Sequence, residues 1–185
     1  MAMPAPLVVP TYTIEDLERF PDDGNRYELL DGVLLVTPAP MPPHQLVIAE
    51  LLYCIAHYLA AAGLGRVVAP GAVEIAPKTH LEPDLLVFPS TEPLNQKWAA
   101  IRRWWLAVEV FSDSSVIYDR DFKRDAYLAL GVREVWLVDW WDRALYVSRS
   151  GQTKDARQRD VVEWHPPGMP GPLQIDLERI FRGLP

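Results

Sequence analysis

Two acidic side chains lie inside short apolar runs, where a charged group is costly. Asp84 begins an apolar run that ends at Phe88, and Glu109 stands within the apolar run 104–111. Both runs are typical of buried strands. A buried carboxylate is usually paired or bound to a metal ion, because an isolated one is strongly destabilised by the loss of water. Lys123 follows Glu109 by fourteen residues on an expected helix, and two acids and a lysine that meet at strand ends indicate a hard-metal site for phosphodiester hydrolysis.

The chemistry of phosphodiester hydrolysis explains why these residue types matter. A divalent ion binds the phosphate, activates water and neutralises developing charge. Mg²⁺ prefers carboxylate oxygens and keeps several waters, so two acids and a backbone carbonyl can be enough protein ligands. A nearby lysine can hold the attacking water or stabilise the charged transition state. Asp84, Glu109 and Lys123 supply these parts.

Each of these residues also has a purely structural interpretation. Asp84 could end a strand or cap a turn, and Glu109 could be a buried acid that pairs with an arginine such as Arg66. Lys123 could form an exposed pair with Asp119 on a shared helix face, four residues earlier. Such a pair would stabilise the helix slightly and carry no function.

Helical and strand patterns alternate along the chain and predict an α/β (α+β) fold. Apolar residues at helical spacing predict one main helix from His44 to Ala62, ended by Gly63. The other expected helices are Thr13–Phe20, Asp119–Leu130 and a short piece near Asp176–Phe181. The expected strands are Tyr27–Leu30 and Val33–Thr37 in a hairpin, Arg66–Ala76 with a possible bulge at Gly71, Asp84–Phe88, Trp104–Phe111, Glu134–Asp139 and Ala144–Ser148. Helices that flank a central sheet are therefore expected.

Length and composition bound the class of protein. The 185 residues correspond to one domain, 1–185, with a core at about 11–149 and a loop and C-terminal extension over 150–185. Cys54 is the only cysteine, which favours a cytoplasmic protein. No uninterrupted apolar run approaches the roughly 18 residues of a membrane span, so we expect no membrane association. The sequence has no nucleotide-binding loop, nucleophile elbow or zincin motif, and we expect no organic cofactor. The net charge of −7 argues mildly against avid non-specific binding of DNA.

A longer pattern carries a family resemblance. It runs through Arg26-Tyr27-Glu28-Leu29-Leu30-Asp31-Gly32, Pro38 to His44, Glu82-Pro83-Asp84-Leu85, Val108-Glu109-Val110-Phe111-Ser112, Tyr118-Asp119-Arg120, Lys123, Tyr127 and Gly131 to Asp139. Pro83-Asp84 followed by Val108-Glu109-Val110 resembles the PD-(D/E)XK nuclease signature. The whole pattern, over about residues 11 to 149, resembles the bacterial Uma-type restriction endonuclease family.

The resemblance implies a restriction endonuclease-like αβββαβ core with a central mixed sheet, preceded by an N-terminal helix and hairpin. It also implies that Asp84 and Glu109 bind Mg²⁺, for which Mn²⁺ could substitute. The superfamily lysine is expected two residues after the strand acid, where this chain has Phe111. The resemblance implies that Lys123 on the next helix has taken over its role.

Three further polar residues are candidates for supporting roles. Glu28 and His44 both match the family pattern. Glu28 could reach the metal or orient a water. His44 could belong to the site or could only be a solvent-facing helix cap. Glu50 could be the helix acid seen in some related nucleases. We interpret Trp140 and Trp141 as packing residues or as an exposed interface patch rather than as base-stacking platforms.

These observations predict a Mg²⁺-dependent endonuclease that acts on DNA. Cleavage of both strands by one small domain would favour a homodimer, because two strands need two sites. The alternative is a catalytically inactive nuclease-fold module that binds nucleic acid or protein, which the phenylalanine at position 111 and the acidic charge would favour. A small-molecule hydrolase is a third, weaker interpretation.

Overall fold

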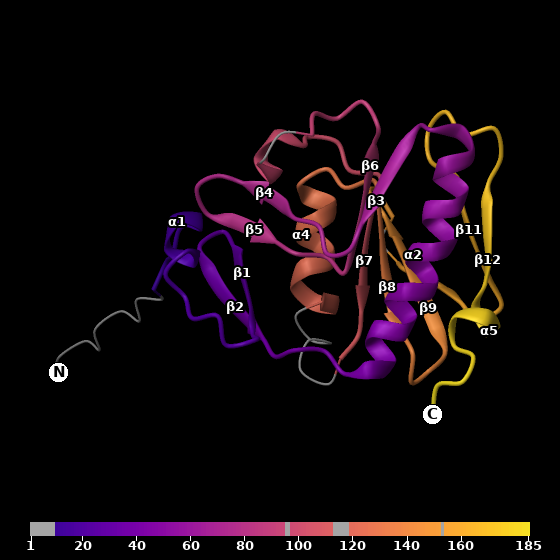
Figure 1. Cartoon of the computed structure of the whole chain (residues 1–185), viewed down its shortest axis with the longest axis horizontal. Helices are drawn as coiled ribbons and strands as arrows, with labels where there is room; N and C mark the ends of the chain where they lie inside the picture. The colour runs from indigo at the N-terminus through magenta and orange to yellow at the C-terminus, as the bar shows by residue number, and fades with distance from the viewer. Residues whose placement is uncertain (1–9, 95–96, 113–118, 153) are drawn as a thin grey trace.

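A six-stranded mixed sheet with helices on both sides forms the centre of the molecule (Figure 1). The computed structural model describes residues 10–94, 97–112, 119–152 and 154–185. The strand order is β10-β9-β8-β7-β6-β3, in which β7 and β8 are parallel and all other neighbours are antiparallel. The strands are β3 (Gly65–Val68), β6 (Leu85–Pro89), β7 (Leu106–Val110), β8 (Glu134–Asp139), β9 (Ala144–Arg149) and β10 (Ala156–Gln158). The expected α/β class is confirmed.

Two smaller sheets complete the strand set. One has the order β2-β1-β5-β4 and the other is a hairpin of β11 and β12. Their bounds are β1 (Arg26–Leu30), β2 (Val33–Thr37), β4 (Val73–Ile75), β5 (Thr79–Leu81), β11 (Val161–Trp164) and β12 (Leu173–Asp176). The predicted hairpin around Asp31-Gly32 is present as β1 and β2, and both turn residues have positive φ angles.

The helices are α1 (Ile14–Leu17), α2 (Pro42–Ala62), α4 (Arg124–Ala129) and α5 (Leu177–Ile180), with a 3₁₀ turn η1 (Trp98–Ala100) and a π-helical turn η2 (Asp119–Lys123). Thr13 caps α1, since its backbone N–H donates to the Asp16 carboxylate at 2.8 Å. The helix expected over Asp119–Leu130 is present as the π turn η2 followed directly by the short helix α4. Asp119 and Lys123 both lie in the π turn.

The alternation of side chains along β6 and β7 divides the core into two layers. Leu106, Val108 and Val110 pack with α2 and the C-terminal hairpin, whereas Ala107 and Phe111 pack on the side of α4. Figure 1 shows α4 and α2 on opposite sides of the sheet. Glu109 shares its face with Ala107 and Phe111, because residues two apart in a strand point the same way. Glu109 of β7 therefore faces α4 and the four-stranded sheet β2-β1-β5-β4, called the small sheet below.

The sequence prediction of one strand over Arg66–Ala76, with a possible bulge at Gly71, was wrong. The segment Arg66–Ala76 is not one strand: β3 and β4 belong to different sheets. Pro70 cannot donate to a ladder, and Gly71 packs so closely on Leu86 that a Cβ atom there would lie 2.5 Å from the Leu86 Cβ atom. Gly71 thus permits close packing where the chain changes sheets, and it is not a bulge.

The C-terminal region is more than a loop and extension. Alternating residues of the β11–β12 hairpin and the buried residues of α5 pack against α2 in the larger core cluster, through Val162, Trp164, Ile175, Leu177, Ile180 and Phe181. The segment from 150 to 160 contains the edge strand β10. This region therefore completes the core on the side of α2.

Among the described helices, α2 has the length and apolar composition of a membrane span. Such a helix is weak evidence on its own, because core helices pass the same test. In this chain Val47, Leu51, Ile55 and Leu59 of α2 are buried in the larger core cluster.

Candidate active site

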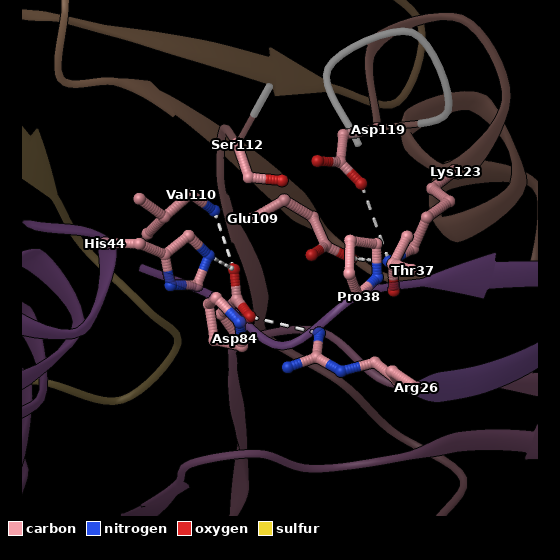
Figure 2. A pocket seen from close by; sticks show the side chains of 11 residues that line it. Arg26, Thr37, Pro38, His44, Asp84, Glu109, Val110, Ser112, Asp119 and Lys123 are labelled. Atoms are coloured by element: carbon pink, nitrogen blue, oxygen red, sulfur yellow. Dashed lines mark hydrogen bonds and ion pairs between the residues drawn. The ribbon is translucent and has the colours of Figure 1, made fainter. Parts of the chain in front are cut away.

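The two acids face each other, since Asp84 directly precedes β6 and Glu109 lies in the neighbouring antiparallel strand β7. Leu85 of β6 pairs with Val108 of β7, so the same register places Asp84 opposite Glu109. Directly opposed residues in an antiparallel pair point to the same face of the sheet. Both side chains line one pocket (Figure 2). The structure thus brings the two acids together, and both are almost completely buried.

Asp84 is held by three groups that favour its charged form. The Val110 backbone N–H donates to Oδ2 at 2.8 Å, His44 Nε2 lies 3.1 Å from the same oxygen, and Arg26 Nη1 lies 3.1 Å from Oδ1. Burial alone would raise the pKa of Asp84. The contacts with His44, Arg26 and the amide outweigh it, so the pKa of Asp84 lies below its ordinary value. Asp84 is therefore a carboxylate, fixed in orientation.

Glu109 has a different environment. Its Oε1 atom lies 2.7 Å from Lys123 Nζ and accepts a hydrogen bond of 2.6 Å from the Tyr127 hydroxyl. Burial, together with the negative charges of Asp119, Asp84 and Glu28, raises the pKa of Glu109 well above its usual value, although Lys123 opposes the rise. Ionised Glu109 is thus a high-energy group in the free protein.

Lys123 connects the strand acid to two further carboxylates. Its Nζ atom lies 3.0 Å from Glu28 Oε1 and 3.6 Å from Asp119 Oδ1, in addition to its contact with Glu109. Burial would lower the pKa of Lys123, but Glu109, Glu28 and Asp119 raise it above its ordinary value. The buried ammonium therefore stays charged and cannot act as a free base.

Three segments outside β6 and β7 position the side chains around the acid pair. The hairpin strand β1 contributes Arg26 and Glu28, and Glu28 is fixed because the Glu82 backbone N–H donates to its Oε1 atom at 2.6 Å. The first turn of α2 contributes His44, whose position near a helix N-terminus favours the anionic Asp84 beside it. The π turn η2 contributes Lys123, and such turns are frequent at functional sites. The site forms only when the small sheet docks on the central one.

The donor set fits a hard divalent cation. Glu28, Asp84, Glu109 and Asp119 are opposed by the permanent cations Arg26 and Lys123, which leaves an excess of negative charge. Among the residues described, no three His, Cys, Asp or Glu side chains form a metal-binding group. Mg²⁺ is usually held by one or two carboxylates and otherwise by water, and binding of such an ion by Asp84 and Glu109 stays a prediction.

The structure places five of the six sequence-predicted residues at this site. Asp84, Glu109, Lys123, Glu28 and His44 converge there. His44 is buried against Asp84 and is not the solvent-facing cap that was considered. Their roles as ligands and catalytic groups stay a prediction.

Glu50 is not at the site. It lies on another face of α2, where its half-exposed carboxylate pairs with Arg179 Nε at 3.2 Å. The expectation that it acts as a helix acid was wrong, because it stands six residues after His44, more than one and a half turns along the helix. Arg66 likewise does not pair with Glu109, since its guanidinium donates to the Glu92 carbonyl.

Three residues of the site had not been predicted as functional from the sequence, although Asp119 was considered as a structural partner of Lys123. Arg26 contacts Asp84, Asp119 contacts Lys123, and Tyr127 donates to Glu109. Asp119 and Tyr127 had a visible signal, since both lie four residues from Lys123 and so share its helical face. Arg26 had none beyond its place in the family pattern, because it reaches Asp84 through tertiary docking.

Comparison with known families identifies the family of the chain. The family model of Uma2, described as "Putative restriction endonuclease", matches residues 14–181. The chain belongs to the Uma2 family. No curated protein matches this Uma2 chain.

A solved structure shares the fold of this Uma2 protein. It is described as a putative nuclease belonging to DUF820 from Anabaena variabilis ATCC 29413, with a TM-score of 0.75 and 15% sequence identity. The similarity covers 92% of this chain and 97% of that chain. It supports the restriction endonuclease-like fold that the sequence pattern implied.

Proposed function

We propose that this Uma2 protein is a divalent-metal-dependent endonuclease that hydrolyses phosphodiester bonds in DNA. The observation that carries the proposal is the buried pair Asp84 and Glu109, opposed across neighbouring strands and lining one pocket with excess negative charge. The family description and the fold shared with a protein described as a nuclease support the same class of reaction.

Asp84 and Glu109 would hold the ion, and their different environments suit that task. Bound there, Mg²⁺ or Mn²⁺ supplies Lewis-acid stabilisation of the phosphate and a more acidic water. Asp84 is already ionised and oriented by His44 and the Val110 amide. Burial destabilises the ionised form of Glu109, so a bound cation would stabilise that form.

The cations of the site would act on the substrate's phosphate. Lys123 holds a permanent charge beside Glu109 and can stabilise negative charge that develops on phosphate oxygens. Arg26 is anchored to Asp84, and its side chain remains 24% exposed, so a phosphate can approach it from solvent. Both charges are fixed before substrate binds, and this preorganisation is what makes such groups effective.

The direct test is cleavage of supercoiled plasmid and of single-stranded circular DNA, each with Mg²⁺, with Mn²⁺ and with EDTA. We expect cleavage only with a divalent ion, and a loss of roughly 100-fold or more in Asp84→Asn and Glu109→Gln, the scale of losing one preorganised group. Glu50→Gln is the matched control and should cleave at the native rate, because its carboxylate lies away from the pocket.

Absence of cleavage of both DNA forms with either ion would contradict the proposal. It would support the alternative of an inactive nuclease-fold module, which has Phe111 where the superfamily lysine is expected. Undiminished cleavage by Asp84→Asn would separately contradict the assignment of the site.

We also propose a homodimer for any cleavage of both strands of a duplex. The described part of the chain shows one pocket with this acid pair, and two antiparallel strands need two sites related by a two-fold axis. Sedimentation with and without DNA measures the oligomeric state. A monomer that linearises plasmid in a single binding event would contradict the dimer.

A further inference from the structure

An aromatic groove continues outward from the catalytic pocket. Pro38, Pro40, His44 and Ser112 line both the pocket and the groove. Trp140, Trp141, Phe111 and Met41 are among the other residues of the groove, and His44 is its sole titratable lining residue in the part of the chain that the structure describes. A pocket crowded with carboxylates therefore lies beside a nearly uncharged groove.

The tryptophan pair is rigidly placed at the end of the catalytic strand. The Phe111 backbone N–H donates to the Val138 carbonyl at 2.9 Å, which ties the end of β7 to the end of β8. The Trp140 indole N–H donates to the Phe111 carbonyl at 3.1 Å. Because Phe111 follows Glu109 by two residues, the indole of Trp140 is anchored to the strand that carries the catalytic acid.

Trp141 extends this anchor into solvent. Its ring stacks on that of Trp140 with centroids 4.5 Å apart and planes inclined by 28°. Trp141 is 46% exposed and Met41, another lining residue, is 63% exposed. The sequence-based interpretation allowed packing or an exposed interface patch: Trp140 packs against the core, and the exposed ring of Trp141 fits a surface patch.

The chemistry of the two neighbouring sites matches the two parts of a nucleotide. A phosphate bound near Lys123 and Arg26 would have its sugar and base within the next few ångströms, and the groove offers aromatic and apolar surface there without a carboxylate. Bases stack on aromatic side chains through their π-faces. In an intact duplex these faces are covered by neighbouring base pairs, so only an unstacked base can occupy such a groove.

We propose that the groove between Trp141 and the Pro38–Met41 segment binds an unstacked nucleobase next to the scissile phosphate. The substrate would then be nucleic acid with an unpaired nucleotide at the cut, in a single strand or at a bulge. This inference rests on the proposed nuclease function and narrows its substrate class. Trp141 is the specificity-determining residue.

Binding and cleavage are measured separately to test it. Binding is followed by fluorescence anisotropy with three end-labelled oligonucleotides of one sequence: single-stranded, fully paired, and paired with a one-nucleotide bulge. The Glu109→Gln background removes turnover, and Trp141→Ala, Trp141→Phe and Tyr53→Ala are compared in it. Tyr53 is the matched control, because it is also exposed but lies on α2 outside both sites.

We expect the single strand and the bulged duplex to bind more tightly than the paired duplex. Trp141→Ala should weaken binding of these two substrates roughly 10- to 100-fold, the range for loss of one base–aromatic stack. Trp141→Phe should retain most of the affinity, and Tyr53→Ala all of it. A single abasic nucleotide is then placed at successive positions of the single strand. At one position it should weaken binding as much as Trp141→Ala does, and there Trp141→Ala should cause no further loss of affinity.

Equal binding by Trp141→Ala and its parent, or equal weakening for paired and unpaired substrates, would overturn the inference. The same variants with Glu109 intact are assayed for cleavage. Cleavage that does not depend on Trp141 would support the nuclease function and exclude nucleobase binding in the groove. Binding that depends on Trp141, without cleavage, would support nucleobase binding and exclude the nuclease function.

Discussion

Replacing Lys123 with methionine should destabilise the fold in a manner that depends on pH. The ammonium is nearly completely buried and lies within 4 Å of carboxylate oxygens from Glu109, Glu28 and Asp119. Removing one partner of a buried ion pair typically costs about 3–5 kcal/mol, because it leaves uncompensated charge behind. Methionine keeps much of the side-chain volume, so we attribute nearly all of the loss to charge.

The sign of the pH dependence follows from Glu109. Its pKa is already raised by burial and by neighbouring acids, and Lys123 opposes that rise. Loss of Lys123 should raise the pKa further. A group whose folded-state pKa is raised stabilises the fold below its unfolded-state pKa, and this stability is lost as pH rises through the folded-state pKa. Lys123→Met should therefore lose about 3–5 kcal/mol near pH 8 and clearly less near pH 5.

Urea denaturation in EDTA at the two pH values measures this difference. The double variant Lys123→Met/Glu109→Gln should be more stable at pH 8 than Lys123→Met alone, since it removes one of the uncompensated charges. Lys154→Met is the control, because Lys154 is exposed. A loss below about 1 kcal/mol, the range of exposed pairs, or the same loss at both pH values, would refute this reasoning.

Three further outcomes follow from the same contacts. Glu109→Gln in EDTA should gain stability relative to the native protein as pH rises above about 4.5, the ordinary value for glutamate, and melts across pH 4–9 would show a flat difference if Glu109 were not perturbed. Arg26→Met should reduce the stability gained between acid and neutral pH, because Asp84 loses a contact that lowers its pKa; an unchanged acid unfolding midpoint argues against that ion pair. Mg²⁺ should raise the melting temperature of the native protein and much less that of Asp84→Asn, by mass action on the folded state, and equal shifts in both proteins would remove Asp84 from the ligand set.

The site residues that the sequence alone revealed are charged residues that stand in apolar segments, where charged side chains are rarely found. Asp84 and Glu109 stand in apolar strands, and a buried acid needs a partner, so their importance followed from local pattern alone. Lys123 followed from the family resemblance, and its contact with Glu109 at 2.7 Å agrees with a lysine supplied by the next helical segment.

Other features depend on tertiary docking that no local pattern contains. Arg26 reaches Asp84 across 58 positions in sequence because the small sheet packs over the central one. Helical periodicity placed Glu50 on α2 but could not tell which face of the helix met the site. The β11–β12 hairpin was missed because its strands are four residues long and flanked by prolines, and its burial comes from packing on α2.

We propose that Asp84 and Glu109 together hold one divalent ion, and anomalous diffraction from a crystal soaked with Mn²⁺ locates that ion. We predict a single peak in the pocket within about 2.0–2.3 Å of one oxygen from each carboxylate, close to the range for small hard divalent ions, and no peak in crystals of Glu109→Gln. A peak elsewhere, or none near these two carboxylates in the native protein at a concentration that supports cleavage, would exclude them as joint ligands of the ion.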